Sequence, residues 1–238
     1  MNNPQVLIKS LDINIPLIGV YDAPDYEKFN PLITPGNRAC VFQYYEDWLN
    51  GKTVHLTKEK HGCGGCGNWW WQIKSRSHKD FIKFLVDDEG LKDSHELMDK
   101  WIKKSDPYKA KYPNILVGPL KEDQWEYLKT ITFFVNPDQL SALIIGANYF
   151  HDPQDPTPVI VPFGSGCMEM LPLFENFEIS QAIIGTTDVA MRQYISRDIM
   201  AFSVTTLMFE NLCSLDKSSF LFKPFLKNLK KARNNFLG

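Results

Sequence analysis

A segment rich in cysteine and glycine, followed at once by three tryptophans, most restricts what this chain can form. It runs from His61 to Asn68, contains Cys63 and Cys66, and leads into Trp69-Trp70-Trp71. Two thiols three positions apart bring two sulfur atoms within reach of one metal ion or of each other. Glycines beside them leave backbone N–H groups free to point at those sulfurs. The segment therefore indicates a site rather than part of the core.

Composition excludes several classes of protein. The chain has 238 residues, 44% of them hydrophobic and 23% charged, which is typical of a globular protein with a sizeable core. The formal net charge of -2 provides no basic footprint for nucleic acid. The N-terminus lacks the pattern of a secretory signal, and no apolar run approaches the length of a membrane helix. We therefore expect a cytoplasmic protein that binds neither nucleic acid nor membrane.

Short strands alternate with helices along the whole chain, which predicts a mixed α+β fold. We expect one compact domain over residues 1–238, with a linker at 106–113 that divides it into halves 1–106 and 114–238. Strands are predicted at 15–21, 52–57, 115–118, 130–135, 159–161, 181–185 and 200–204, and helices at 38–49, 79–86, 94–104, 137–147, from 167 onward, and at 205–213. The basic tail at 223–233 predicts an amphipathic helix packed on its own domain.

Each predicted half carries a cysteine near the start of a helix. Cys40 follows Asn37-Arg38-Ala39 and falls in a predicted first turn, where the helix dipole lowers the pKa of a thiol. Cys167 follows Ser165-Gly166 in a similar setting. If the halves are an ancient duplication, the two cysteines approach one pseudo-symmetric centre together with the segment of Cys63.

Four thiols match the ligand count of a tetrahedral zinc site or a cubane iron–sulfur cluster. The predicted ligands are Cys40, Cys63, Cys66 and Cys167, and because they come from three remote segments we favour an iron–sulfur cluster over zinc. The N–H groups of Gly62, Gly64, Gly65 and Gly67 are the expected donors to ligand sulfurs.

Residues beside the two central thiols have alternative interpretations. His61 is either a nitrogen ligand, a proton donor to a thiolate, or a solvent-facing loop residue. Trp69, Trp70 and Trp71 either stack on a planar ligand or shield a cluster, or at least two of them fill the core. Cys213, at the end of a late apolar helix, is expected to be a core residue.

A dithiol–disulfide pair formed by Cys63 and Cys66 is the main redox alternative. It is disfavoured because Gly67 and the tryptophans do not predict a helix, whereas thioredoxin-type pairs begin one. A second polar cluster contains Thr187, Asp188 and Arg192. It is either a helix-surface ion pair between Asp188 and Arg192 or an anion site at a helix start.

The order of these motifs resembles an uncharacterised prokaryotic family, domain of unknown function 169. The resemblance runs from about Ile15 to Leu212 and rests on Arg38-Ala39-Cys40, Gly51, the Cys63 segment, residues 135–139, Gly166-Cys167, Gly185, Asp188 and Arg192. It implies a cytosolic protein of bacteria or archaea and draws attention to cysteines matching Cys40, Cys63 and Cys167. Cys66 is then a feature of this member.

The leading functional hypothesis is a cysteine-ligated metal centre with a redox or small-molecule-handling role. A binding module for a small anion, with free thiols, is the non-enzymatic alternative, and a thiol-disulfide oxidoreductase is the third. The residues do not decide whether the protein is an enzyme, nor do they define its redox partner or oligomeric state.

Overall fold

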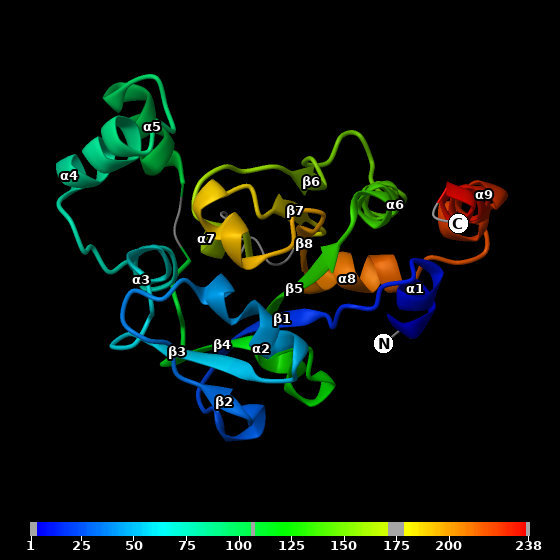
Figure 1. Ribbon diagram of the computed structural model, residues 1–238, viewed down its shortest axis with the longest axis horizontal. Coiled ribbons are helices and arrows are strands. Elements are labelled where there is room, and N and C mark those ends of the chain that lie inside the picture. The colour runs from blue at the N-terminus through cyan, green and yellow to red at the C-terminus, as the bar shows by residue number, and fades with distance from the viewer. Residues whose placement is uncertain (1–3, 106–107, 171–178, 237–238) are drawn as a thin grey trace.

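A computed structural model describes residues 4–105, 108–170 and 179–236. Within these ranges eight strands form one mixed sheet in the order β2-β3-β4-β1-β5-β8-β7-β6 (Figure 1). The strands are β1 (Ile18–Ala23), β2 (Leu32–Ile33), β3 (Thr53–Thr57), β4 (Asn114–Pro119), β5 (Leu128–Val135), β6 (Val159–Ile160), β7 (Ala182–Gly185) and β8 (Met200–Thr205). The predicted mixed α+β class is confirmed.

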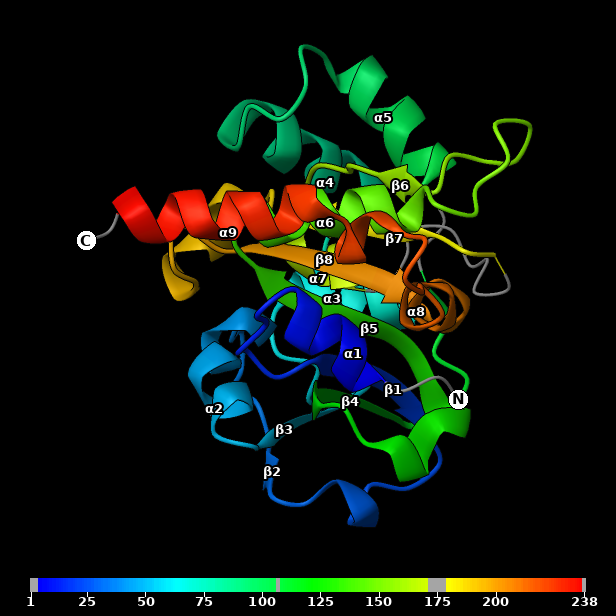
Figure 2. The ribbon, with the colours of Figure 1, turned by 90° about the vertical axis from the view of Figure 1, so that its right-hand side faces the viewer.

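Helical segments connect the strands and cover both faces of the sheet (Figure 2). The α-helices are α1 (Pro4–Ser10), α2 (Tyr45–Leu49), α3 (Gly64–Trp71), α4 (His78–Lys83), α5 (His95–Lys104), α6 (Pro137–Ala147), α7 (Gly166–Met170), α8 (Thr206–Cys213) and α9 (Pro224–Phe236). Shorter helical turns are η1 (Glu27–Phe29), η2 (Val41–Tyr44), the π-helical η3 (Phe84–Asp88), η4 (Glu122–Tyr127), η5 (Val189–Tyr194) and η6 (Phe220–Phe222).

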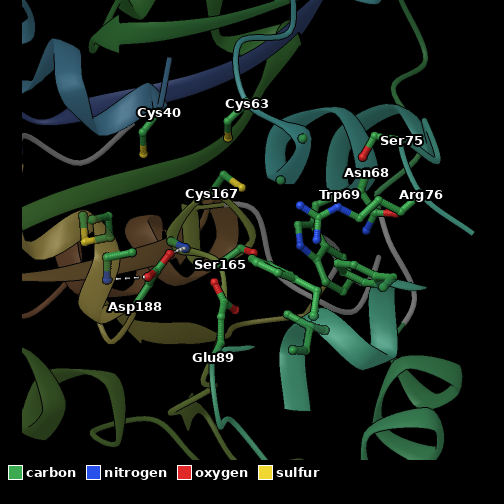
Figure 3. Close-up of a pocket in the computed structure, with 18 of the residues that line it drawn as sticks. Cys40, Cys63, Asn68, Trp69, Ser75, Arg76, Glu89, Ser165, Cys167 and Asp188 are labelled. Atoms are coloured by element: carbon green, nitrogen blue, oxygen red, sulfur yellow. Dashed lines mark hydrogen bonds between the residues drawn. The ribbon is translucent and has the colours of Figure 1, made fainter. Parts of the chain in front are cut away.

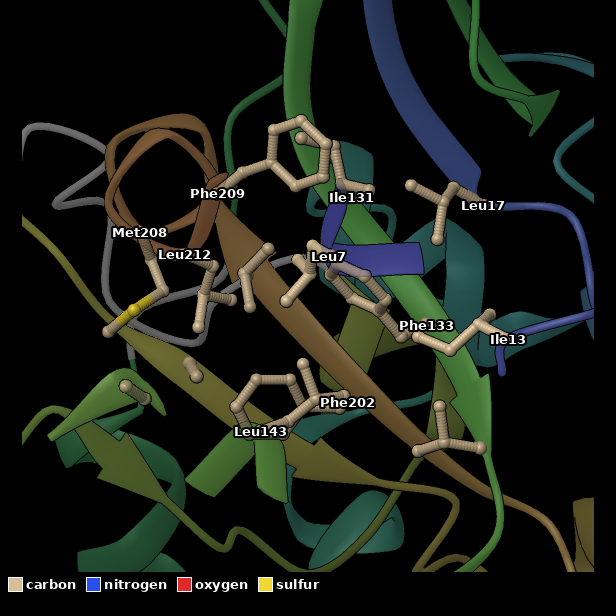
Figure 4. Packing of buried hydrophobic residues seen from close by; sticks show 14 of the residues in the cluster. Leu7, Ile13, Leu17, Ile131, Phe133, Leu143, Phe202, Met208, Phe209 and Leu212 are labelled. Atoms are coloured by element: carbon tan, nitrogen blue, oxygen red, sulfur yellow. The ribbon is translucent and has the colours of Figure 1, made fainter. Parts of the chain in front are cut away.

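Alternation along the central strand β5 explains why the sheet has two unlike faces. Side chains point alternately to opposite sides of a strand, so Ile131 and Phe133 face one way and Thr132 and Phe134 the other. The first pair packs in a core with α1, α6 and α8, where Phe202 and Leu143 also lie (Figure 4). Phe134 belongs to a second core that contains the cysteine-bearing segments. The site is therefore built on one face of the sheet only.

Each set of four consecutive strands has the same internal order. The sequence β2-β3-β4-β1 on one side is matched by β6-β7-β8-β5 on the other, with β1 and β5 antiparallel at the centre. The senses agree as well, since β2–β3 and β6–β7 are parallel while β3–β4 and β7–β8 are antiparallel. This topology suits the proposal of two related halves, with β4 belonging to the first set although it follows the 106–113 segment.

Residues 108–112 of that segment are fixed to β1 by a buried carboxylate. Asp22 accepts hydrogen bonds from the Tyr108 hydroxyl (2.6 Å) and from the backbone N–H groups of Lys111 (2.6 Å) and Tyr112 (2.9 Å). Residues 106 and 107 lie outside the described ranges. The described part of the predicted linker is thus tied to the centre of the sheet.

Two helical regions lie outside the main layers. Helices α4 and α5, with η3 between them, form a projecting unit with its own small core around Met98 (Figure 1). Helix α9 packs on its own domain, as predicted, where Lys230 pairs with Asp12 (2.5 Å) and Arg233 with Asp138 (2.7 Å). The projecting unit is important below because it forms one wall of the site.

Candidate functional site

A backbone contact joins the segments of Cys40 and Cys63. The N–H of Arg38 donates to the carbonyl of Gly62 (3.1 Å), and Gly62 has a φ of 74°. A Cβ at Gly62 would lie 2.5 Å from the carbonyl oxygen of Ala39, so only glycine fits both the conformation and the space. This glycine lets the two cysteine segments approach each other.

Cys63 begins a helix, which makes the sequence prediction for this region wrong. Helix α3 spans Gly64–Trp71, with Cys63 as its N-cap, and Cys66 lies in its first turn. The glycines lowered the expected helix content, but burial of Trp69 and Trp70 in the core favours the helix in the folded protein. The motif therefore does have the helix-start position whose supposed absence counted against a dithiol.

Three sulfur atoms lie together at the start of α3. The Sγ atoms of Cys63 and Cys66 are 3.9 Å apart. A Cβ built on Gly65 would lie 3.5 Å from the Sγ of Cys63 and 3.3 Å from that of Cys167. The missing side chain of Gly65 leaves these sulfurs uncovered. Residues 63, 66 and 167 are thus brought together from two remote parts of the chain.

Hydrogen bonds stabilise the thiolate form of Cys63. The thiols of Cys167 and Cys66 bond to its sulfur, and the backbone N–H groups of Cys66 and Gly65 donate to it as well. Together these contacts outweigh partial burial and hold the pKa of Cys63 well below the usual range of a thiol. Two of the four glycine positions that we proposed as sulfur-facing, 64 and 65, open this helix, and the N–H of Gly65 contacts sulfur.

The other three thiols are held in the neutral form. For Cys66, the bond with Cys167 favours the thiolate, but the bond to Cys63 and complete burial outweigh it and raise the pKa. Hydrogen bonds to Cys63 and Cys66, together with burial, raise the pKa of Cys167. Burial raises the pKa of Cys40 to about 11, with smaller contributions from Cys63 and Asp188. One negative charge is thus concentrated on Cys63.

Cys40 lines the same end of the cavity as this cluster. It is the N-cap of η2 and has an extended backbone, so it lies just before the helical turn rather than inside it as predicted. Figure 3 shows the sulfur atoms of Cys40, Cys63 and Cys167 directed toward the same space. The remaining cysteine, Cys213, lies in α8 against the core on the other face of the sheet, as expected.

Backbone contacts position Cys167. The indole N–H of the fully buried Trp70 donates to the Cys167 carbonyl (3.0 Å), and Asp188 accepts from the N–H of Gly166 (3.1 Å). Helix α3 packs on α7, and η5 packs on η2. In both contacts beside the thiols, α3 with α7 and η2 with η5, an element from the first half of the chain therefore packs on one from the second half.

A cavity of about 640 Å³ opens above the thiols. Cys40, Cys63 and Cys167 form one end of it, and the projecting unit of α4, η3 and α5 forms the opposite wall (Figure 3). Among its other lining residues are Trp69, Phe81, Phe84, Leu85, Ile102 and Met191, with the charged groups Lys74, Arg76, His78, Glu89 and Asp188. A pocket of this size and lining accommodates a small organic molecule.

His61 and Trp69 contact the motif in different ways. The Nδ1 of His61 donates to the carbonyl of Cys63 (3.1 Å), and its ring lies so close to Gly67 that a Cβ there would be 2.7 Å away. Its ring is thus packed on α3. Trp69 is 4% exposed and lines the cavity, with its ring edge against Trp101. Trp69 therefore both packs in the core and forms part of the cavity wall.

The predicted polar cluster is not assembled as an anion site. Asp188 caps η5 and lines the cavity, but Arg192 donates to the carbonyls of Ile199 (2.6 Å), Ser196 (3.2 Å) and Arg197 (2.8 Å). Thr187 donates its hydroxyl to Glu169 and to the carbonyl of Pro162 (3.0 Å). The guanidinium of Arg192 thus stabilises a loop and does not pair with Asp188.

Several groups at the site were not identified from the sequence. Glu169, 1% exposed, lies two residues after Cys167, and burial raises its pKa to about 7 despite its bonds to Thr187. Arg76 and Phe84 come from the projecting unit and its approach. A glutamate beside Cys167 was visible in the sequence, but the cavity wall depends on long-range packing.

Within the described ranges, no three or more histidine, cysteine, aspartate or glutamate side chains already surround one metal position. None of the described helices has the length and apolar character that a membrane span requires.

The fold and site define a mixed-sheet protein with a thiol-lined pocket on one face of its sheet. A family model described as uncharacterised ArCR matches residues 7–214, and the chain belongs to this family, DUF169. No curated protein and no solved structure matches it significantly. The sequence resemblance to this family is therefore confirmed.

Proposed function

We propose that the thiol cluster holds a cysteine-ligated metal centre in a cytoplasmic protein with a redox or small-molecule-handling role. The supporting observation is the 3.9 Å separation of the Cys63 and Cys66 sulfurs. Metal–sulfur bonds near 2.3 Å at tetrahedral angles place two ligand sulfurs about 3.8 Å apart. The pair therefore has the spacing of two ligands on one metal, with Cys167 beside it.

An iron–sulfur cluster remains our preferred centre, with zinc as the alternative. A close pair of thiolates suits one iron of a [2Fe–2S] cluster better than a cubane, where each iron takes one cysteine. The ligands would be Cys40, Cys63, Cys66 and Cys167, and the N–H groups at residues 65 and 66 would bond to sulfur. Binding would require Cys40 and Cys167 to move toward the Cys63 and Cys66 pair.

Anaerobic purification and reconstitution test this proposal. We expect about two irons and two acid-labile sulfides per chain, with broad visible absorption. The variants Cys63→Ser and Cys167→Ser should lose both, whereas Cys213→Ser, on the other face, should retain them. Zinc alone would indicate a mononuclear site. Failure to retain either metal after reconstitution would contradict the proposal.

Thiol–disulfide exchange is the second candidate, and the position of Cys63 at the start of α3 favours it. In this reaction the Cys63 thiolate attacks one sulfur of a substrate disulfide and releases the first substrate thiolate, which takes up a proton. Cys66 then loses its proton, attacks the Cys63 sulfur and releases the second. A dithiol reductant restores the protein thiols by the reverse exchange.

Redox titration of the metal-free protein in a glutathione buffer distinguishes this candidate. The expected product is a reversible disulfide between Cys63 and Cys66, located by mass spectrometry. A Cys66→Ser variant should instead accumulate a mixed disulfide at Cys63. If the reduced thiols persist in oxidised glutathione, exchange chemistry is excluded.

A further inference from the structure

The cavity above the thiols is apolar along one wall and cationic at one rim. Trp69, Phe84, Leu85 and Ile102 provide the apolar wall, while Lys74 and Arg76 lie on the segment between α3 and α4. This combination is independent of whether a metal is bound, because none of these residues is a thiol.

The two cations at the rim form no salt bridge within the described residues, although Glu89 of the same cavity interacts electrostatically with Arg76. Within the described part of the chain, neither Arg76 nor Lys74 has a carboxylate or hydrogen-bond partner, whereas His78 is paired with Asp99 (2.7 Å). The guanidinium of Arg76 lies over the ring of Phe84, 4.1 Å from its centroid. This contact orients the group while leaving its N–H donors available.

The two acidic residues that line the cavity, Asp188 and Glu89, both interact with other groups of the protein. Asp188 accepts from the N–H groups of Gly166 (3.1 Å) and Ala190 (2.9 Å), so both of its oxygens are occupied. The Glu89 carboxyl interacts electrostatically with both Arg76 and Asp188. Among the charged groups of the described cavity lining, hydrogen-bonding capacity is therefore left on Arg76, Lys74 and the Glu89 carboxylate.

We propose that this pocket binds an organic anion with an apolar body, held at its charged end by Arg76 and Lys74. The apolar body lies against Trp69 and Phe84 and extends toward Cys63. A planar guanidinium suits a carboxylate, sulfonate or phosphate, each of which accepts two parallel hydrogen bonds from it. The ligand class is thus an aromatic or aliphatic acid of a size that fits about 640 Å³.

Two fluorescent dyes that differ in charge test the proposal. The probe 8-anilinonaphthalene-1-sulfonate carries a sulfonate, and N-phenyl-1-naphthylamine has the same aromatic body without it. We expect Arg76→Gln to weaken binding of the sulfonate dye about tenfold, the effect of losing a hydrogen bond to a charged group, and to leave the neutral dye unaffected. Lys74→Gln should act in the same direction.

Matched variants separate charge from packing. Lys83→Gln removes an exposed cation of α4 that does not line the cavity and should bind both dyes as the wild type does. Phe84→Ala should weaken both dyes. All dye titrations use metal-free protein, so that a failed metal proposal leaves this result unchanged. Equal affinity of Arg76→Gln and Lys83→Gln for the sulfonate dye, or equal losses for both dyes in Arg76→Gln, would overturn the proposal.

Discussion

The pH dependence of Cys63 alkylation tests the electrostatics of the site. Only a thiolate reacts with iodoacetamide, so the rate follows the thiolate fraction. The thiols of Cys167 and Cys66 and two backbone N–H groups stabilise the Cys63 thiolate, which lowers its pKa. Its thiolate is therefore present throughout the neutral range and is lost only as the pH falls through the lowered pKa.

The expected rates can be estimated from these states. At pH 6, a thiol with a pKa of 9.0 is about one part in a thousand thiolate, while Cys63 is almost entirely ionised. A lower pKa also reduces nucleophilicity, by roughly 3,000-fold for a fall from 9.0 to about 2 at a Brønsted coefficient near 0.5. The two effects nearly cancel, so Cys63 should react at pH 6 at about the rate of an ordinary accessible thiol, and the pH dependence of the rate distinguishes the two.

The assay uses reduced protein stripped of metal, with peptide mass spectrometry to follow each cysteine. Between pH 6 and 8 the rate at Cys63 should be flat, whereas an ordinary thiol gains about tenfold per pH unit. Cys167→Ala removes the largest stabilising contact and should make the rate pH-dependent, while Cys213→Ala should not. A wild-type rate at Cys63 that climbs tenfold per unit would refute the assignment.

Three further predictions concern stability. Folding raises the pKa of Glu169 from 4.5 to about 7, so protonation of this carboxyl stabilises the folded state. This contribution to the free energy of unfolding is complete below pH 4.5 and is lost as the pH rises through 7. In urea unfolding, the free energy of unfolding of Glu169→Gln should rise relative to that of the wild type by up to about 3 kcal/mol between pH 5 and 8.5. The surface variant Glu59→Gln is the control, and a difference between Glu169→Gln and wild type that stays constant with pH would contradict this prediction. Asp22→Ala should cost about 3–5 kcal/mol in the same assay, since one buried and two part-buried donors lose their acceptor, and a cost below about 1 kcal/mol would contradict the contact. Gly62→Ala should lower the melting temperature and expose Cys40 and Cys63 to alkylation, whereas Gly51→Ala, with open space around its Cβ, should leave alkylation of these thiols unchanged.

Strong local signals explain which parts of the fold could be predicted. Asn136, Pro137 and Gln139 predict the start of α6, and the structure contains the full capping box there. The β-branched run at 130–135 predicts β5, and its alternation is visible in the two cores. These signals act within a few neighbouring residues, so the sequence contains them completely.

Helix α3 could not be predicted because local preference and tertiary packing disagree there. Its glycines disfavour a helix by about 1 kcal/mol each relative to alanine, but Trp69 and Trp70 are buried by the rest of the molecule. Similarly, the i, i+4 spacing of Asp188 and Arg192 suggested a pair, but the long Arg192 side chain reaches loop carbonyls instead. The outcome at both places depends on segments far away in sequence.

The grouping of thiols illustrates an intermediate case. The spacing of Cys63 and Cys66 alone predicts their proximity, whereas the approach of Cys167 depends on the order of the whole sheet. Cys40 lies seven residues after the end of β2 and Cys167 seven after the end of β6. This equivalence becomes visible only once the strands are assigned.

Cobalt(II) titration of the reduced protein tests most directly whether the four thiols act together. Cobalt bound by thiolates shows near-ultraviolet charge-transfer absorption that grows with the number of sulfur ligands, and it occupies sites built for zinc or iron. We predict cobalt binding with thiolate charge-transfer absorption that is reduced by serine at position 40, 63, 66 or 167 and unchanged in Cys213→Ser. Absence of charge-transfer absorption at stoichiometric cobalt, or an equal spectrum after Cys63→Ser, would contradict a common thiolate centre.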